Sequence, residues 1–231
     1  MIINLKDYAN EAQFILQAAK PFIIAQSINV LDEIKSDLET GRGGGKAFTW
    51  ETKRPMKFKE ARDYDRRKGT VIPITVEISF CSQFSPISRK GNDWKIDRLE
   101  THLKLFRDGN DEPVLHLHID KKNKDQRGPH LHMQISEECT QRLGMRIGVP
   151  RFPFGFLLPT DCLDFALAEF FQDEWGQTQT GAQGIRLIRD AQKARARNAS
   201  IKLQAEWDKI TNKTPVSILQ DCYLGDDLRL N

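Results

Sequence analysis

Hydrophobic residues occupy every second position in four segments through the middle of the chain: 71–80, 99–106, 114–120 and 129–136. Because successive side chains of a strand point to opposite faces, this alternation predicts strands that each have one apolar face. A short Asp-Gly-Asn turn and a polar loop separate the last three segments, as in antiparallel hairpins. We therefore expect residues 99–136 to form a three-stranded antiparallel meander, with 71–80 as a further strand.

The first part of the chain has the three-to-four-residue spacing of an amphipathic helix, over residues 5–40. Pro21 is expected to kink this stretch or to start a second helix, since it lacks an amide donor. Gly41 is the expected helix end, and the glycines that follow it predict a flexible hinge. The basic segment 42–68 has no clear period, and we expect it to be a loop.

After the strands comes a proline-, glycine- and phenylalanine-rich segment, 148–159, which we expect to be an irregular apolar loop that covers the core or binds a protein partner. Helical patterns follow up to Trp175 and again over 182–210. Helices, then strands, then helices predict an α+β fold, here an antiparallel sheet flanked by helices from both ends of the chain. We expect a single domain, 1–231, with four parts: helical 1–41, basic loop 42–68, sheet 70–136, and apolar loop with C-terminal helices 148–231.

The chain has 231 residues, of which 39% are hydrophobic and 29% charged, which favours a folded domain over a disordered chain. It has no uninterrupted apolar stretch of about 18 residues, and its start does not resemble a signal peptide. Its four cysteines form no CxxC pair. We therefore expect a cytoplasmic protein with reduced thiols and no membrane partner.

The net charge is only +3, but the charge is unevenly distributed. Residues 42–68 contain ten Lys or Arg against four acidic residues, and 186–202 contain six against one. Local positive fields of this kind favour nucleic acid as a partner, with an acidic protein as the second interpretation. The alternatives are a loop whose aromatic residues reach the core and a solvated helix face. The candidate nucleic-acid-binding residues are Lys46, Trp50, Lys53, Arg54, Arg186, Arg189, Lys193 and Arg197.

All five histidines of the chain lie between residues 102 and 132. Strand alternation puts them opposite the leucines and isoleucines of the same strands, so they share the polar face of the meander. We expect His118 to pair with His130, His116 to lie opposite His132, and His102 to lie near His118.

Crowded imidazoles stay neutral, and neutral imidazoles are good metal ligands. We expect a divalent ion, zinc or manganese, or else no cofactor, in which case two histidines would act as general acid and base. The remaining interpretation is that the histidines only build the sheet surface. The candidate catalytic residues are His116, His118, His130 and His132. The candidate metal ligands are the same four histidines and Asp120. Arg151 is a candidate anion-binding residue.

The segment Pro129–Ile135 resembles the His-hydrophobic-His strand of HUH nucleases, which would imply His130 and His132 as metal ligands and a tyrosine nucleophile on a nearby helix. None of the three tyrosines lies on the helix that follows. The segment His116–Asp120 resembles the His-x-His-x-Asp-His motif of metallo-β-lactamase-like hydrolases, but lysine replaces the last histidine. We adopt neither assignment.

Together these patterns predict a phosphodiesterase or nuclease directed at nucleic acid or a nucleotide. We expect it to use the histidine cluster together with a divalent metal ion, and to be of a bacterial toxin, defence or mobile-element type. One alternative is a non-catalytic module that binds nucleic acid or protein and has structural histidines. The other is a metal-dependent hydrolase of small molecules.

Overall fold

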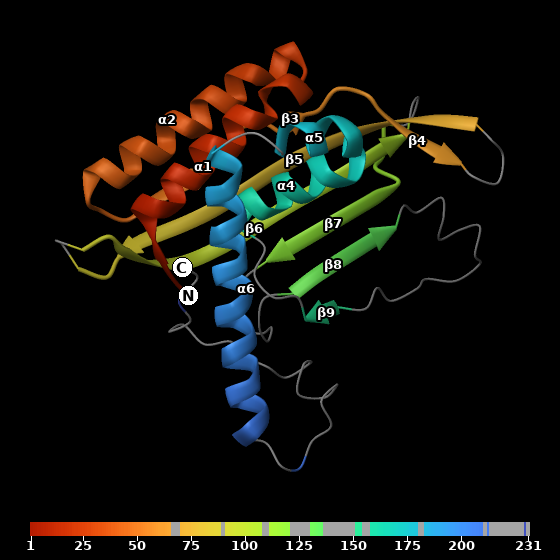
Figure 1. Cartoon of the computed structure of the whole chain (residues 1–231). Helices are drawn as coiled ribbons and strands as arrows, with labels where there is room; N and C mark the ends of the chain where they lie inside the picture. The colour runs from red at the N-terminus through yellow and green to blue at the C-terminus, as the bar shows by residue number, and fades with distance from the viewer. Residues whose placement is uncertain are drawn as a thin grey trace.

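A computed structural model describes most of the chain, and an antiparallel sheet with helices on one face dominates it (Figure 1). The α+β prediction is therefore confirmed. The described residues are 1–65, 70–88, 91–107, 111–120, 130–135, 151–153, 158–179 and 183–209, with Asn212 and Arg229. Backbone alone is described for 62–65, 70–72, 130–135, 151–153, Asp173, Gln179, Gln183 and Glu206.

The main path of the sheet runs in the order β2-β5-β6-β7-β8-β9, and neighbouring strands along it are antiparallel. The strands of the described residues are β1 (Ile2–Asn4), β2 (Phe48–Glu51), β3 (Met56–Lys57), β4 (Ala61–Asp65), β5 (Thr70–Pro86), β6 (Asp93–Arg107), β7 (Leu115–Asp120), β8 (His130–Ile135) and β9 (Arg151–Pro153). Because β6, β7 and β8 follow one another in both sequence and sheet, the predicted meander is confirmed. The predicted apolar loop 148–159 includes β9 and, at Pro159, the first residue of a helix, and its residues 148–150 and 154–157 lie outside the described part.

Strands β5 and β6 are longer than the sequence pattern predicts, and a β-bulge explains why. Gln83 pairs with Arg98 and Phe84 with Ile96, so the register skips Asp97. Buried positions of β6 therefore change from even to odd numbers along the strand while the same face stays against the core. The sequence alternation breaks at the bulge, and the strand consequently looks as if it began only at residue 99.

The prediction of a loop over 42–68 is wrong for residues 42–65, and residues 66–68 lie outside the described part. Three short strands of this segment, β4, β3 and β2, pair in turn with successive parts of β5. Each has five residues or fewer, which is too short for a visible two-residue period. The Thr52 hydroxyl accepts a hydrogen bond from the Phe80 amide at 3.0 Å and thereby joins this segment to β5.

The helices gather on one face of the sheet (Figure 1). They are α1 (Leu5–Ala19), α2 (Ile28–Gly44), α4 (Pro159–Phe170), α5 (Gln172–Gln179) and α6 (Gln183–Lys209), with short 3₁₀ turns at Lys20–Phe22 and Ala25–Ser27. The predicted break at Pro21 is confirmed. The predicted end at Gly41 is wrong, because α2 continues to Gly44 and Gly45 takes the left-handed conformation, with φ 60°. The glycines expected to form a hinge are thus partly helical.

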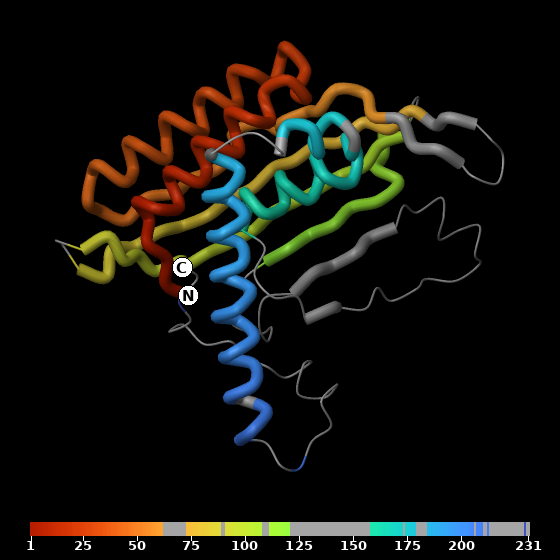
Figure 2. The backbone as a smooth tube through the Cα atoms, in the orientation of Figure 1, coloured from red at the N-terminus to blue at the C-terminus, as the bar shows by residue number. Residues whose placement is uncertain are grey.

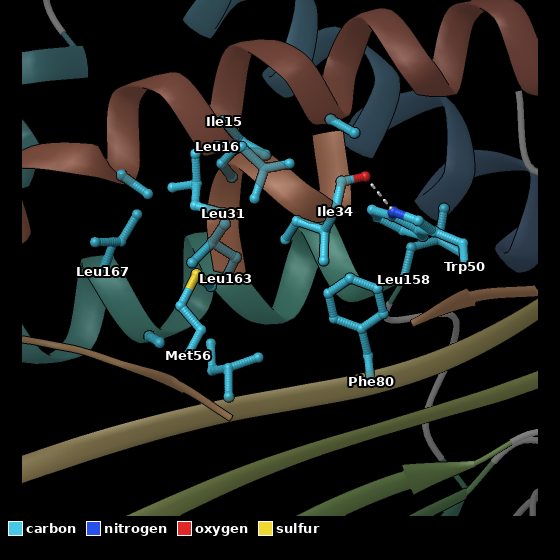
Figure 3. Close-up of a cluster of buried hydrophobic side chains, with 14 of the residues drawn as sticks. Ile15, Leu16, Leu31, Ile34, Trp50, Met56, Phe80, Leu158, Leu163 and Leu167 are labelled. Carbon is cyan, nitrogen blue, oxygen red and sulfur yellow. Dashed lines mark hydrogen bonds between the residues drawn. The ribbon is translucent and has the colours of Figure 1, made fainter. Parts of the chain in front are cut away.

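The hydrophobic core lies between the sheet and helices α1, α2 and α4 (Figure 3). Val76, Ile78 and Phe80 of β5 face the helices, in agreement with the predicted alternation. Trp50 is buried beside Phe80, with ring centroids 4.3 Å apart, and its indole Nε1 donates a hydrogen bond to the Ile34 carbonyl at 2.8 Å.

Helix α6 is the longest helix of the described part, and its second half extends past the sheet (Figures 1 and 2). Near the start of the chain, Ile2 forms a bridge with Arg229, whose guanidinium also pairs with Asp93 at 2.9 Å. In the described part, no helix has the length and apolar character needed to cross a membrane.

Candidate functional site

Among the described side chains, the face of the sheet that points away from the core has a polar row across β5, β6 and β7. We call this side the outer face; its described side chains include Glu77, Ser79 and Cys81 of β5, Glu100, His102 and Lys104 of β6, and His116, His118 and Asp120 of β7. The backbone register aligns Ser79 with His102, His102 with His118, and His118 with His132 of β8. The predicted proximity of His102 and His118 is confirmed.

The pairing of β7 with β8 differs from the prediction. His118 is opposite His132, Asp120 is opposite His130, and His116 is opposite Gln134. The predicted pairs His118–His130 and His116–His132 are therefore wrong. A shift of two residues leaves every side chain on its original face, so hydrophobic alternation fixes the face but not this register.

His102 lies in the middle of the three described imidazoles. Its ring stacks on that of His118, with centroids 4.2 Å apart and planes 12° from parallel. Its Nδ1 is 2.9 Å from Nε2 of His116, which is hydrogen-bonding distance. One of these two nitrogens must be protonated and the other not, so the pair favours neutral rings.

Burial, together with the neighbouring His118 and His116, lowers the pKa of His102 to about 4. A positive charge on His102 would lose hydration and face two imidazoles that can also become charged. His102 is therefore neutral at pH 7 and acts as a stacking and hydrogen-bonding group.

His118 and Asp120 lie next to each other on the outer face of β7. Nε2 of His118 is 3.9 Å from Oδ2 of Asp120, and the two side chains are 22% and 11% exposed. Glu100, opposite Asp120 on β6, accepts a hydrogen bond from Arg98 at 2.6 Å. Arg98, on the same strand, thus balances the charge of Glu100. The carboxylate of Asp120 instead lies beside His118.

Among the described side chains, no three His, Cys, Asp or Glu residues are placed to hold a metal ion. The side chains of His130 and His132 lie outside the described part, although their backbone positions are given. The metal prediction therefore depends on these two residues.

The predicted nucleic-acid-binding residues fall into three groups. Trp50 is in the core with 1% exposure, so its ring cannot stack on a base in this fold, and that prediction is corrected. Lys46, Lys53 and Arg54 are exposed, with Lys53 near Asp37 (4.0 Å) and Arg54 near Glu33 (3.9 Å).

The four predicted basic residues of α6 are exposed and lie on the side of the helix that faces away from the core: Arg186, Arg189, Lys193 and Arg197. Ile188 and Ala199 mark the buried side of the same helix. The basic stripe consequently belongs to the helical side of the sheet and not to the outer face. The backbone of Arg151, the predicted anion ligand, pairs with His132, and its side chain lies outside the described part.

Sequence analysis did not single out a buried ionic cluster formed by Glu11 of α1, Asp161 of α4 and Arg195 of α6. Arg195 donates to both oxygens of Glu11 at 2.7 Å and also hydrogen-bonds Asp161, and its side chain is 2% exposed. A signal was present: Arg195 is seven residues after Ile188 and four before Ala199, on the apolar side of the helix.

Comparisons of the chain with protein-family models, with curated proteins and with solved structures found no match. The features that bear on function are therefore the geometry of the outer face and the basic stripe of α6.

Proposed function

We propose that this protein hydrolyses phosphodiester bonds in nucleic acid or nucleotides, using the histidine cluster of the outer face. The observation that supports the proposal is the register of β6, β7 and β8, which brings His102, His118 and His132 into one row with Asp120 and His130 in the next. Four of these five residues are imidazoles, the group best suited to proton transfer or metal binding near neutral pH. His116 and His118 of β7 are partly exposed, whereas Asp120 is buried beside them.

Each described residue would have a distinct part in such a reaction. His118 and Asp120 are directed toward each other and lie nearest to the β8 histidines, so they would contact the reacting phosphate or its water. His102 would hold the ring of His118 by stacking, and His116 would fix His102 by its hydrogen bond. The exposed cations of α6 would bind the phosphate backbone away from the scissile bond.

The test is a cleavage assay of the full chain on single- and double-stranded DNA, on RNA and on bis(p-nitrophenyl) phosphate. We expect hydrolysis that His118→Ala abolishes, while Lys104→Ala, on the same face, keeps it. Both variants change residues of the outer face. If each unfolds at the same temperature as the unaltered protein, a loss of cleavage is due to the missing imidazole and not to unfolding. If the protein cleaved bis(p-nitrophenyl) phosphate but neither DNA nor RNA, the proposal of a nucleic-acid substrate would be contradicted. If it cleaved none of these substrates, the proposal of hydrolysis would be contradicted.

A second candidate function is supported by a different observation. The basic stripe of α6 is exposed and points away from both the core and the outer face, so it is able to bind nucleic acid without the histidines. In that case the protein is a binding module, and His102, His116 and His118 are structural. Binding that persists in His118→Ala, with no cleavage by the unaltered chain, would favour this function.

A further inference from the structure

We infer that the basic stripe of α6 binds a single strand of nucleic acid, with an unpaired base stacked on the exposed indole of Trp207. The inference rests on the proposal that this stripe binds nucleic acid, and it specifies the kind of nucleic acid. It does not depend on the histidines of the outer face.

The line of exposed residues on α6 continues beyond the four cations of the basic stripe. At about 100° per residue, a set of exposed positions lies within about 80° around the helix axis. These positions, which we call the extended stripe, are Arg186, Arg189, Lys193, Arg197, Ser200, Gln204 and Trp207. Ile188, Arg195 and Ala199 are buried on the opposite side of the helix, so the extended stripe faces away from the rest of the protein. At 1.5 Å per residue it is about 32 Å long.

The first half of the extended stripe is cationic. Arg189 contacts Asp190 at 3.3 Å. The other three cations form no ion pair with any described side chain: Arg186, Lys193 and Arg197. Like charges three or four residues apart on a helix repel one another, and an anionic chain that runs along the helix removes this repulsion. The spacing of the cations therefore suits a row of phosphates better than a compact anion.

The second half of the extended stripe ends in an exposed aromatic ring. Trp207 is 40% exposed, and Ile201, next to the stripe, is 57% exposed. The other three tryptophans of the chain are buried: Trp50, Trp94 and Trp175. This half of α6 extends past the sheet (Figure 1). Cations that bind phosphates beside an aromatic ring that stacks a base are the combination used by proteins that bind single strands.

The exposed ring favours a single strand over a duplex. In a duplex the faces of each base are covered by neighbouring bases, so a protein reaches only the base edges and the backbone. A single strand leaves the base faces free, and stacking on an aromatic ring then adds to the phosphate contacts. A duplex also completes a helical turn in about 34–36 Å, so its groove winds away from a straight helix as long as the extended stripe. A flexible single strand follows the whole line.

The charges of α6 argue against two other partners. Arg197 is near the middle of the extended stripe, so an antiparallel second copy would place this cation against its own counterpart. Acidic side chains of another protein would satisfy the cations but offer no flat ring to Trp207. Asp190 and Asp208 lie at one edge of the extended stripe, and they restrict a bound phosphate chain to the other edge, where Arg189 and Trp207 lie.

The test measures binding of the full chain to a labelled oligothymidine of about 12 nucleotides, within the range of 4–16 nucleotides typical of single-strand sites. An unlabelled duplex and polyglutamate are added as competitors at one salt concentration, because binding to phosphates depends strongly on salt. Each titration is repeated with His118→Ala, so that cleavage cannot remove the probe. We expect oligothymidine to bind more tightly than either competitor by about tenfold or more, since only oligothymidine stacks on the ring.

The ring itself is tested by substitution. Trp207→Ala should weaken oligothymidine binding by about 5- to 150-fold, the range for one base stacked on an aromatic side chain, and should leave duplex binding unchanged. Trp207→Phe keeps a ring and should retain most of the affinity. Leu187→Ala is the matched control, because it removes an exposed apolar side chain of α6 that lies outside the extended stripe. It should bind oligothymidine as the unaltered chain does.

Tryptophan fluorescence gives a second, direct measurement of the same ring. Because the other three tryptophans are buried, iodide should quench only the emission of Trp207 in the free protein. Bound oligothymidine should quench this emission and protect it from iodide, whereas polyglutamate should do neither. The change should be absent in Trp207→Phe.

Failure of this inference and failure of the proposed nucleic-acid binding give different results. The inference is overturned if the duplex or polyglutamate binds as tightly as oligothymidine, or if Trp207→Ala loses no more affinity than Leu187→Ala. A duplex that binds as tightly, with binding weakened by Arg189→Ala, leaves the basic stripe as a nucleic-acid surface. If neither Arg189→Ala nor Lys193→Ala weakens binding to either nucleic acid, the proposed role of the basic stripe is contradicted as well.

Discussion

Arg195 of α6 and Glu11 of α1 form a buried ion pair with two parallel hydrogen bonds, both 2.7 Å long, between residues 184 positions apart. Asp161 of α4 bonds the same guanidinium, so one side chain joins three helices. Burial of charges is costly unless they are paired, and removal of one partner leaves the others without compensation. The cluster therefore fixes how α6 packs on the rest of the fold.

The first prediction concerns this cluster. Arg195→Met should destabilise the protein by about 3–5 kcal/mol, because two buried carboxylates would then lack their cation. Chemical denaturation at pH 7 measures the change. Arg197→Met, two residues further along α6 and exposed, is the control and should change stability by less than about 0.5 kcal/mol. Similar effects of both substitutions would show that the pair is not important for stability.

A second prediction concerns pH. Burial is the main cause that raises the pKa of both Glu11 and Asp161, opposed by Arg195. Tyr8 also faces this cluster, with its pKa raised well above its usual value mainly by burial. One guanidinium balances one carboxylate, and so the second carboxylate adds a buried negative charge when it ionises.

The sign follows from proton binding. A carboxyl group whose pKa is raised in the folded state holds its proton longer there than in the unfolded chain. Its stabilising contribution is complete below the ordinary carboxyl pKa of about 4 and is lost as the pH rises through the raised value. Asp161→Asn should therefore become more stable relative to the unaltered protein as the pH rises above about 4. Urea denaturation over a pH series checks this, and a relative change of opposite sign would contradict it.

Two glycines of α2 should respond in opposite ways to alanine. A Cβ at Gly41 would lie 2.2 Å from a ring carbon of Phe48, whereas a Cβ at Gly43 would meet nothing within 4 Å. Gly41→Ala should lower the free energy of unfolding by about 1–3 kcal/mol through overpacking. Gly43→Ala should raise it by about 0.4–1 kcal/mol, because alanine favours the helix and restricts the unfolded chain. Thermal unfolding of the two variants decides whether Gly41 is a packing position.

Trp50 should matter for stability and not for nucleic-acid binding. Trp50→Phe removes the hydrogen bond to the Ile34 carbonyl and part of a buried ring, at a cost of about 1–3 kcal/mol. Binding to a labelled oligonucleotide under conditions where both proteins are folded should be unchanged, since the ring is in the core. A loss of affinity for the oligonucleotide with unchanged stability would show that Trp50 does contribute to nucleic-acid binding.

The basic stripe of α6 is tested by salt dependence. Replacement of Arg189 and Lys193 by alanine should weaken nucleic-acid binding and reduce the slope of log affinity against log salt by about one per lost phosphate contact. Lys6→Ala, an exposed cation on α1, is the control. An affinity that does not change with salt in the unaltered protein would exclude phosphate contacts by this helix.

The faces of the central strands follow from the order of amino acids alone. Leucine and isoleucine alternate with histidine in β7 and β8, and because side chains alternate across a strand, the histidines had to share one face. Pro21 likewise determined a helix break, since it has no amide to donate. These features are local: each depends on neighbours within a few residues.

Which residues contact one another depends on how distant segments pack. The observed register pairs His118 with His132, two residues away from the predicted pairing with His130. Both registers bury the same face of the strands, so the hydrophobic pattern does not distinguish them. Trp50 is buried in the core, where its indole nitrogen donates a hydrogen bond to the carbonyl of Ile34. Arg195 is buried because its guanidinium pairs with Glu11, which is distant in sequence. Composition predicts the cost of burying such groups, but the compensating contacts exist only when distant segments are packed together.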